Sequence, residues 1–169
     1  MRSQRPINQR RAPPSASMDG VDPLFARLYA ARGVSDCTEL DYGLASLAPV
    51  SSLDNVSDAV DLLLTHKEDR IIVIGDFDVD GATSTALMCL SLRDLGFHRV
   101  DFRIPDRVRH GYGLSRAVIE DLAAPYPALI VTVDNGISSI AGVAAAKANG
   151  WRVLITDHHL AGSQLPASD

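Results

Sequence analysis

The sequence predicts an α/β fold: a parallel sheet with helices on both faces, preceded by a short helical segment. From Arg70 onward, short runs of β-branched and apolar residues alternate with longer stretches of helical spacing. The first of these runs, Ile71–Ile74, contains no polar residue, which is typical of a strand buried on both faces. Strands joined through helices form right-handed crossovers and therefore a parallel sheet covered on both faces.

The chain is expected to begin with two parts that precede the sheet. Residues 1–20 are polar and contain several prolines, so we expect a disordered tail. Residues 21–68 are expected to form a helical segment. Its first helix begins at Asp22-Pro23, and two more helices are expected near 37–47 and 54–66.

The α/β domain is expected over residues 69–169. Its strands are expected at 71–75, 99–104, 129–133 and 151–156, and its helices at 82–95, 114–123 and 138–149. Ser115 and Ser138 are suitable N-caps. Gly96 and Gly150 lie where the ends of helices need a residue at positive φ.

A cluster of acidic residues follows the first strand. Asp76, Asp78 and Asp80 occupy alternating positions, and side chains two residues apart in an extended segment point the same way. Two carboxylates about 4 Å apart repel by roughly 4 kcal/mol at an effective dielectric constant near 20. Such a cluster therefore usually holds a hard cation or shares a proton. It lies at the carboxyl edge of the sheet, where open α/β folds bind ligands.

Two further strands end in residues of the same kind. Asp134 follows the third predicted strand, and Asp157-His158-His159 follows the fourth. Parallel strands bring these residues to the same edge as Asp76 and Asp78. Carboxylates with a neutral imidazole suit Mn²⁺, and carboxylates alone suit Mg²⁺. Two such ions about 3.5–4 Å apart generate hydroxide and hold phosphoryl oxygens during hydrolysis.

Composition and charge argue against several classes of protein. The net charge of −5 is not that of a generally basic nucleic-acid binder, although residues 99–116 carry five arginines against two aspartates, a local excess of +3. No apolar run approaches the roughly 20 residues of a membrane span, and the N-terminal arginines are not followed by the apolar core of a signal peptide. The two cysteines lack metal-type spacing. We therefore expect a reduced, cytoplasmic location and no membrane partner.

Three motifs resemble those of the DHH phosphoesterase superfamily: Asp76-Phe-Asp78-Val-Asp80-Gly81, Val133-Asp134-Asn135-Gly136 and Asp157-His158-His159. The stretches at 28–34, 104–107 and 111–115 are similar to those of the bacterial single-stranded-DNA exonucleases in that superfamily. The resemblance covers about residues 22–166. It implies a metal-dependent enzyme that degrades single-stranded DNA in the 5'→3' direction during DNA repair and recombination.

The resemblance also implies a role for each motif residue. The metal ligands would be Asp76, Asp78, Asp134 and His158, with Asp134 bridging two ions of Mn²⁺ or Mg²⁺. The catalytic residues would be His159 at the scissile phosphate, Asp157 orienting an imidazole, and Asp80 supporting the ligands. The residues expected to bind the substrate are Asn135, which also supports the ligands, together with Tyr112, Arg107 and Arg109.

The family pattern continues beyond the last residue of this sequence. Members carry a fourth metal-binding aspartate, a further C-terminal domain and an OB-fold that holds DNA, whereas this sequence stops at Asp169. We therefore expect an incomplete DHH domain that binds metal weakly and has little activity alone. Two alternative hypotheses remain within the superfamily. The chain could be an inert truncated domain, or it could be a nucleotide phosphodiesterase or pyrophosphatase.

A phosphatase of the haloacid-dehalogenase type is the alternative outside the superfamily. Residues 77–83 resemble the motif that carries its nucleophile, but its mechanism needs a downstream lysine. The only lysine available is Lys147, inside a predicted helix, and the Asp157-His158-His159 motif would have no role. A dinucleotide-binding domain is disfavoured because no Gly-x-Gly-x-x-Gly sequence follows the first strand.

Overall fold

The computed structural model describes residues 18–169, so most of the predicted tail lies outside the described residues. The chain divides into two compact units at residues 54 and 55. In the first, α1 (Pro23–Ala30) begins as predicted, because Asp22 accepts a hydrogen bond from the N–H of Leu24 at 2.8 Å. The rest of its regular structure consists of short 3₁₀ turns at Cys37–Leu40, Leu44–Ser46 and Val50–Ser52.

The single helix predicted over 37–47 is therefore wrong. Asp36 caps the first turn through the N–H of Thr38, but the backbone is extended again at Asp41. The side chain of Asp41 accepts a hydrogen bond from the N–H of Gly43, a local turn that competes with helix formation.

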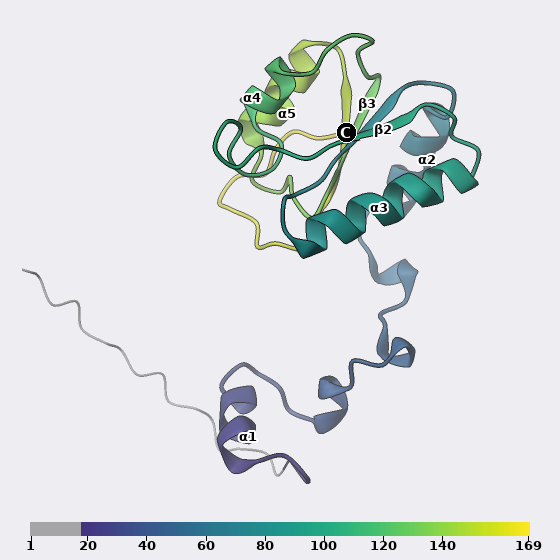
Figure 1. Cartoon of the computed structure of the whole chain (residues 1–169). Helices are drawn as coiled ribbons and strands as arrows, with labels where there is room; N and C mark the ends of the chain where they lie inside the picture. Colours follow the sequence, from purple (N-terminus) through teal and green to yellow (C-terminus); the bar gives the residue numbers. More distant parts are fainter. Residues whose placement is uncertain (1–17) are drawn as a thin grey trace, which may run out of the picture. The chain divides into compact units, whose positions relative to one another are not determined.

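The second unit is a four-stranded parallel sheet with helices on both faces, which confirms the predicted fold class (Figure 1). The strand order is β2-β1-β3-β4, with β1 at Ile71–Ile74, β2 at Val100–Arg103, β3 at Leu129–Val133 and β4 at Arg152–Thr156. The helices are α2 (Val56–Thr65), α3 (Val79–Asp94), α4 (Arg116–Glu120) and α5 (Ile140–Ala148). None of the helices in the described residues has both the length and the apolar character needed to cross a membrane.

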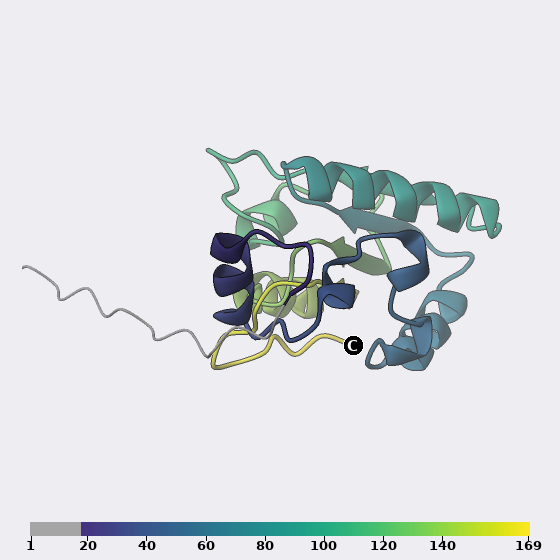
Figure 2. The ribbon, with the colours of Figure 1, turned by 90° about the horizontal axis from the view of Figure 1, so that it is seen from below.

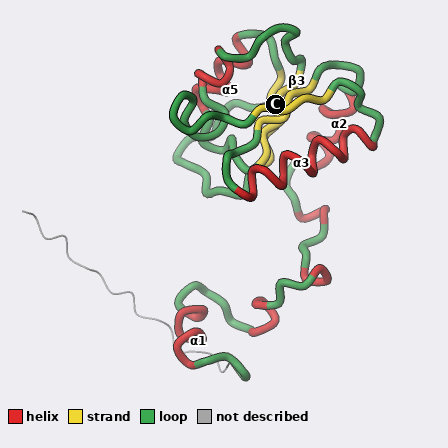
Figure 3. The backbone as a smooth tube through the Cα atoms, viewed as in Figure 1, coloured by secondary structure: helices red, strands yellow, loops and turns green. Residues whose placement is uncertain are grey.

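Alternate residues of the strands enter two separate apolar clusters. Ile71 and Val73 of β1 pack with Cys89 of α3 in one cluster. Ile72 and Ile74 pack in the other, which includes residues of α4 and α5. Figures 2 and 3 show α3 and α5 on opposite sides of the strands.

Helix α2 contributes to the cluster on the α3 side. Its residues Ala59, Leu62 and Leu63 are partly buried there, and it falls in the same compact unit as the sheet. The sequence places this helix with the preceding segment, 21–68. The structure instead starts the α/β unit at residue 55, because the apolar stripe of α2 covers part of the sheet.

The starts of α2, α3, α4 and α5 differ from the predicted ones by two or three residues. Helix α3 begins at Val79, three residues before the predicted start at 82, because Asp78 caps it through the N–H of Gly81 at 2.9 Å. Helix α5 has Ser139 at its N-cap position, because a turn from the N–H of Ser139 to the carbonyl of Gly136 precedes it. The predicted N-cap Ser115 is confirmed, since its hydroxyl accepts from the N–H of Val118. Gly96 and Gly150 have the predicted positive φ.

The outer edge of each outermost strand carries a side-chain contact. On β4, Asp169 accepts from the N–H of Val153 at 3.0 Å, and its own N–H donates to the Val153 carbonyl at 2.9 Å. Asp169 also forms ion pairs with Lys147 and Arg152. On β2, the guanidinium of Arg93 donates to the carbonyl of Val100 at 2.8 Å.

Candidate metal centre

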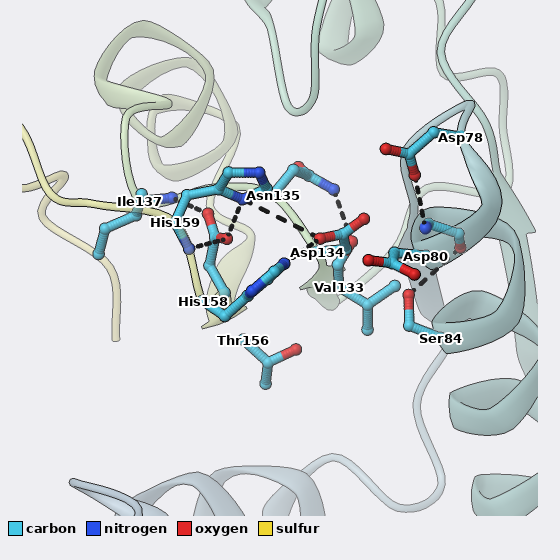
Figure 4. Close-up of polar contacts among 12 residues, drawn as sticks. Asp78, Asp80, Ser84, Val133, Asp134, Asn135, Ile137, Thr156, His158 and His159 are labelled. Carbon is cyan, nitrogen blue, oxygen red and sulfur yellow. Dashed lines mark hydrogen bonds and ion pairs between the residues drawn. The ribbon is translucent and has the colours of Figure 1, made fainter. Parts of the chain in front are cut away.

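The carboxyl ends of β1, β3 and β4 bring acidic and imidazole side chains to one place (Figure 4). Carboxylate oxygens of Asp76, Asp78 and Asp134 all lie within 4.8 Å of one another. Ligand atoms of Asp134, His158 and His159 form a second group by the same measure. Asp134 belongs to both groups, which is where a carboxylate that bridges two ions would lie. The structure therefore brings together the four side chains predicted as metal ligands.

The backbone at Asp134 is unusual for a non-glycine residue. Its φ of 60° lies in the left-handed region, which costs energy for residues with a Cβ and is concentrated at functional sites. Two hydrogen bonds hold this conformation: the N–H of Asp134 donates to the carbonyl of Thr156 at 3.1 Å, and the hydroxyl of Tyr112 donates to the carbonyl of Asp134 at 3.1 Å.

Asn135 ties together the strand ends that carry the acids. Its side-chain NH₂ donates to the carbonyls of Ile74 and Val133, at 3.0 and 2.9 Å. Its side-chain oxygen accepts from the N–H of Leu114 at 3.1 Å. The residue has no exposed surface, so the predicted direct contact with substrate is not available to it. Its place is behind the metal ligands, where it fixes the ends of β1 and β3.

Two buried carboxylate oxygens have no hydrogen-bond partner among the described residues, one on Asp76 and one on Asp134. Burial raises the pKa of Asp76, and the charges of Asp78 and Asp134 add to this against an opposing hydrogen bond from the N–H of Phe77. A buried carboxylate without a partner is costly, and a divalent cation would satisfy both oxygens. The donor set of carboxylates and imidazole also suits Mn²⁺. The residues therefore fit a metal pair.

The two histidines are held by different acids. The Nε2 of His158 lies 2.9 Å from a carboxylate oxygen of Asp134. The Nδ1 of His159 lies 2.7 Å from Asp157, and this hydrogen bond raises the pKa of His159. Burial opposes ionisation of Asp157, but hydrogen bonds from the N–H groups of Ile137 and His159 outweigh it and lower its pKa. Asp157 thus orients the ring of His159 and leaves its Nε2 available.

Tyr112 and Arg107 lie beside this cluster. Burial, reinforced by nearby carboxylates, raises the pKa of Tyr112 to about 12, so its hydroxyl remains a donor. The ring of Tyr112 meets those of Phe77 and His159 edge-on. The guanidinium of Arg107 lies over the ring of Phe77, 4.4 Å from its centre.

Arg109, the other arginine predicted to bind substrate, is engaged elsewhere. Its guanidinium forms an ion pair with Asp121 at 2.6 Å. Its backbone N–H donates to the carboxylate of Asp106 at 2.9 Å. The structure brings Arg107 to the acids and holds Arg109 on the C-terminal end of α4.

Asp80 does not converge with the other acids in the way predicted. The prediction requires an extended chain, but Asp80 lies in the first turn of α3. It lines a groove of about 410 Å³ whose wall also contains Asp134, His158 and Thr156. Sequence reasoning missed the small polar residues of α3 in this wall, Thr83 and Ser84, because they carry no motif or spacing that distinguishes them from an ordinary helix.

The chain resembles known proteins both in sequence and in structure. Residues 70–169 match the DHH family, N-terminal domain. The whole chain is 45% identical to the single-stranded-DNA-specific exonuclease RecJ of Salmonella typhimurium, and 86% of it is 34% identical to the RecJ of Bacillus subtilis. The chain spans only 30% and 19% of the lengths of these two relatives.

Two solved structures agree with this relationship. An exonuclease RecJ bound to manganese matches 73% of this chain with a TM-score of 0.63 and 36% identity, over 31% of its own length. RecJ of Thermus thermophilus in complex with Mn²⁺ matches 85% of this chain with a TM-score of 0.56 and 34% identity, over 20% of its own length.

Proposed function

Since the chain belongs to the DHH family, we propose that it supplies the metal-dependent site of an exonuclease that hydrolyses phosphodiester bonds in single-stranded DNA. One observation carries the proposal: Asp134 is shared by two groups of ligand atoms and has a buried oxygen without a partner. The relatives named as single-stranded-DNA-specific exonucleases and the manganese in the similar structures support it.

The proposal assigns each residue a part in phosphodiester hydrolysis. Asp76, Asp78, Asp134 and His158 hold the two ions, with Mn²⁺ favoured over Mg²⁺ by the imidazole. When bound, the ions would supply a hydroxide nucleophile and would neutralise charge on the phosphate. His159, oriented by Asp157, presents its Nε2 to the phosphate.

Two further residues assist from the side of the cluster. Tyr112 holds the backbone of Asp134 in its left-handed conformation through its hydroxyl. Arg107 provides positive charge to the phosphate. We also propose the 5'→3' direction, the role in DNA repair and recombination and the cytoplasmic location, which follow from the family resemblance.

The haloacid-dehalogenase alternative has no support in the arrangement of these residues. Its mechanism needs a lysine near the acids, but Lys147 binds Asp169 and the carbonyl of Ala167. Asp78, the residue it uses as nucleophile, caps α3 and belongs to the acid group of Asp134.

A chimera tests the proposal, because the chain spans less than a third of its Salmonella relative. Residues 1–169 replace the matching portion of that protein, and degradation of end-labelled single-stranded DNA is followed. We expect activity with Mn²⁺, no activity after chelation, and a loss of more than about 100-fold in Asp134→Ala, since even indirect losses at metal sites reach that size. The exposed Asp61→Ala of α2 serves as the control and should retain full activity.

Two outcomes would contradict the proposal. One is a folded chimera that binds Mn²⁺ but leaves single-stranded DNA intact; cleavage of short nucleotides or pyrophosphate instead would favour the other members of the superfamily. The second is DNA degradation that survives Asp134→Ala, because the hydrolysis would then not depend on this centre.

A further inference from the structure

We propose that Phe77, which stands between two metal-ligating aspartates, positions Arg107 to bind a phosphate group of the substrate. The inference rests on the proposed function and adds a residue to it. Phe77 is a positioning residue here, because it acts through Arg107 and touches neither ion nor phosphate itself.

The environment of Arg107 differs from that of its neighbouring arginines. Arg109 forms an ion pair with Asp121, and Arg116 forms one with Glu120. Among the described residues, Arg107 has no carboxylate partner within ion-pair distance, and its guanidinium lies 4.4 Å from the centre of the Phe77 ring. This is the geometry of a cation–π contact.

An aromatic partner has a different effect on a guanidinium from that of a carboxylate. A carboxylate would neutralise the charge and occupy two of the five N–H donors, whereas a ring face restricts the position of the group and leaves its charge and donors available. Arg107 is therefore held in place in a form that can still bind a phosphate bidentately.

The ring of Phe77 is itself fixed to the metal centre. Its backbone follows Asp76 directly. The ring of Tyr112 meets it edge-on, with centres 6.5 Å apart, and the hydroxyl of Tyr112 binds the carbonyl of Asp134. The ring that lies against Arg107 is thus connected to Asp76 through the chain and to Asp134 through Tyr112.

The test uses the 169-residue chain and four substitutions: Phe77→Leu, Phe77→Tyr, Arg107→Ala and Arg109→Ala. Two probes are used in the presence of Mg²⁺. Binding of inorganic phosphate is followed by nuclear magnetic resonance of the backbone amide groups, and binding of a short oligothymidine is followed by fluorescence anisotropy at low salt. Titration of Mn²⁺ by electron paramagnetic resonance checks the metal centre of every variant.

We expect Phe77→Leu to weaken oligothymidine binding about two- to fivefold, the size of an exposed cation–π contact. Phe77→Tyr should restore it, because the ring face is retained. Arg107→Ala should reduce the slope of log binding constant against log salt concentration by about 0.7, which corresponds to one phosphate contact on a single strand. Adding Phe77→Leu to Arg107→Ala should weaken binding no further. Arg109→Ala, which removes an arginine already paired with Asp121, should change binding less than about twofold.

The inference would be overturned if Phe77→Leu bound both probes as tightly as the unmutated chain, if its effect added to that of Arg107→Ala, or if Mn²⁺ affinity fell in parallel. In the last case Phe77 would act on the metal centre and not on Arg107. The phosphate probe separates this inference from the proposed function. A chain that binds phosphate in a manner dependent on Phe77, beside a chimera that leaves single-stranded DNA intact, would retain the inference and contradict the function.

Discussion

At the scale of single residues, the metal centre works against the stability of the folded chain. Asp76 is buried beside two other carboxylates, and one of its oxygens has no partner among the described residues. Burial, aided by the neighbouring acids, raises the pKa of Asp76 above its unfolded value. The stability that this group contributes is therefore greatest below the unfolded pKa and falls as the pH rises through the folded pKa.

The substitution Asp76→Asn should therefore have opposite effects with and without metal. At neutral pH without metal, we expect the free energy of unfolding to rise by on the order of 1 kcal/mol, because the amide removes a buried charge. With Mn²⁺ at 100 times its Kd the unmutated chain should gain about 2.7 kcal/mol, and the variant much less. Urea unfolding with and without Mn²⁺ measures both values.

The exposed acid Asp80 provides a control for this prediction. Asp80→Asn should give no gain in stability without metal, since its carboxylate is not buried. A variant Asp76→Asn that is less stable than the unmutated chain in both conditions would show that this carboxylate is structural.

The sequence predicts some of the site residues and cannot predict others. Asp76, Asp134 and His158 lie within two residues of the ends of apolar strands, and parallel pairing alone brings strand ends together. Asn135 also follows a strand, but only the folded chain shows that its amide binds the carbonyls of Ile74 and Val133 and faces away from the groove. The pairing of Arg109 with Asp121 likewise joins a loop to a helix end and has no sequence signal.

At the scale of elements, the close approach of α3 to the end of β1 builds the acid group. Asp78 caps the helix, and Gly81 in its first turn rests on the backbone of Asp76. A Cβ at Gly81 would lie 2.5 Å from the carbonyl oxygen of Asp76, which is too close for any side chain. The helix can approach Asp76 to this extent only because residue 81 has no side chain.

We expect Gly81→Ala to lower the stability of the chain by about 1–3 kcal/mol, the usual cost of overpacking. Mn²⁺ affinity should fall as well, since the helix must move away from Asp76 and carries Asp78 with it. Thermal unfolding and Mn²⁺ titration measure the two effects. Gly162→Ala is the matched control, because the nearest atom to its added Cβ is 3.8 Å away. If Gly81→Ala and Gly162→Ala had the same stability and the same Mn²⁺ affinity, the close approach of α3 to Asp76 would not depend on the missing side chain.

The start of α3 also shows why boundaries are harder to predict than elements. The small residues from Ala82 onward suggest a helix, but the cap at Asp78 places its start three residues earlier, at Val79. Asp80 thereby changes from an extended position, in which it would join Asp76 and Asp78, to a helical one facing the groove. One capping hydrogen bond decides between the two arrangements.

At the scale of the whole molecule, the unit at 55–169 has its own core on both faces of the sheet. The family match begins at residue 70, yet α2 lies before it and packs on the α3 side of the sheet through Ala59, Leu62 and Leu63. A polypeptide that begins at residue 70, where the family match begins, would lack α2 and its contacts with the sheet. The assignment of α2 to the sheet depends on contacts across the fold, which the periodicity of its own residues does not reveal.

Two shortened chains test the role of α2. Residues 55–169 should fold with a Tm close to that of the full chain, because they retain both apolar clusters. Residues 70–169 lack the partly buried leucines of α2, so their free energy of unfolding should be lower by roughly 2–3 kcal/mol. For about 100 residues this lowers the Tm by roughly 10–20 °C. The fluorescence of Trp151, the only tryptophan and a buried one, follows the unfolding. Equal Tm values for the two chains would contradict a role for α2 in the core.

The contacts on the outer edges of β2 and β4 have a consequence for how separate molecules meet. An open strand edge is a template for pairing with another chain, which leads to aggregation. On β4, Asp169 engages both the N–H and the carbonyl of Val153, and on β2, Arg93 engages the carbonyl of Val100. A foreign strand would have to displace charged side chains before it could extend the ladder at either of these points. Side chains thus obstruct the addition of another strand at one point on each outer edge of the sheet.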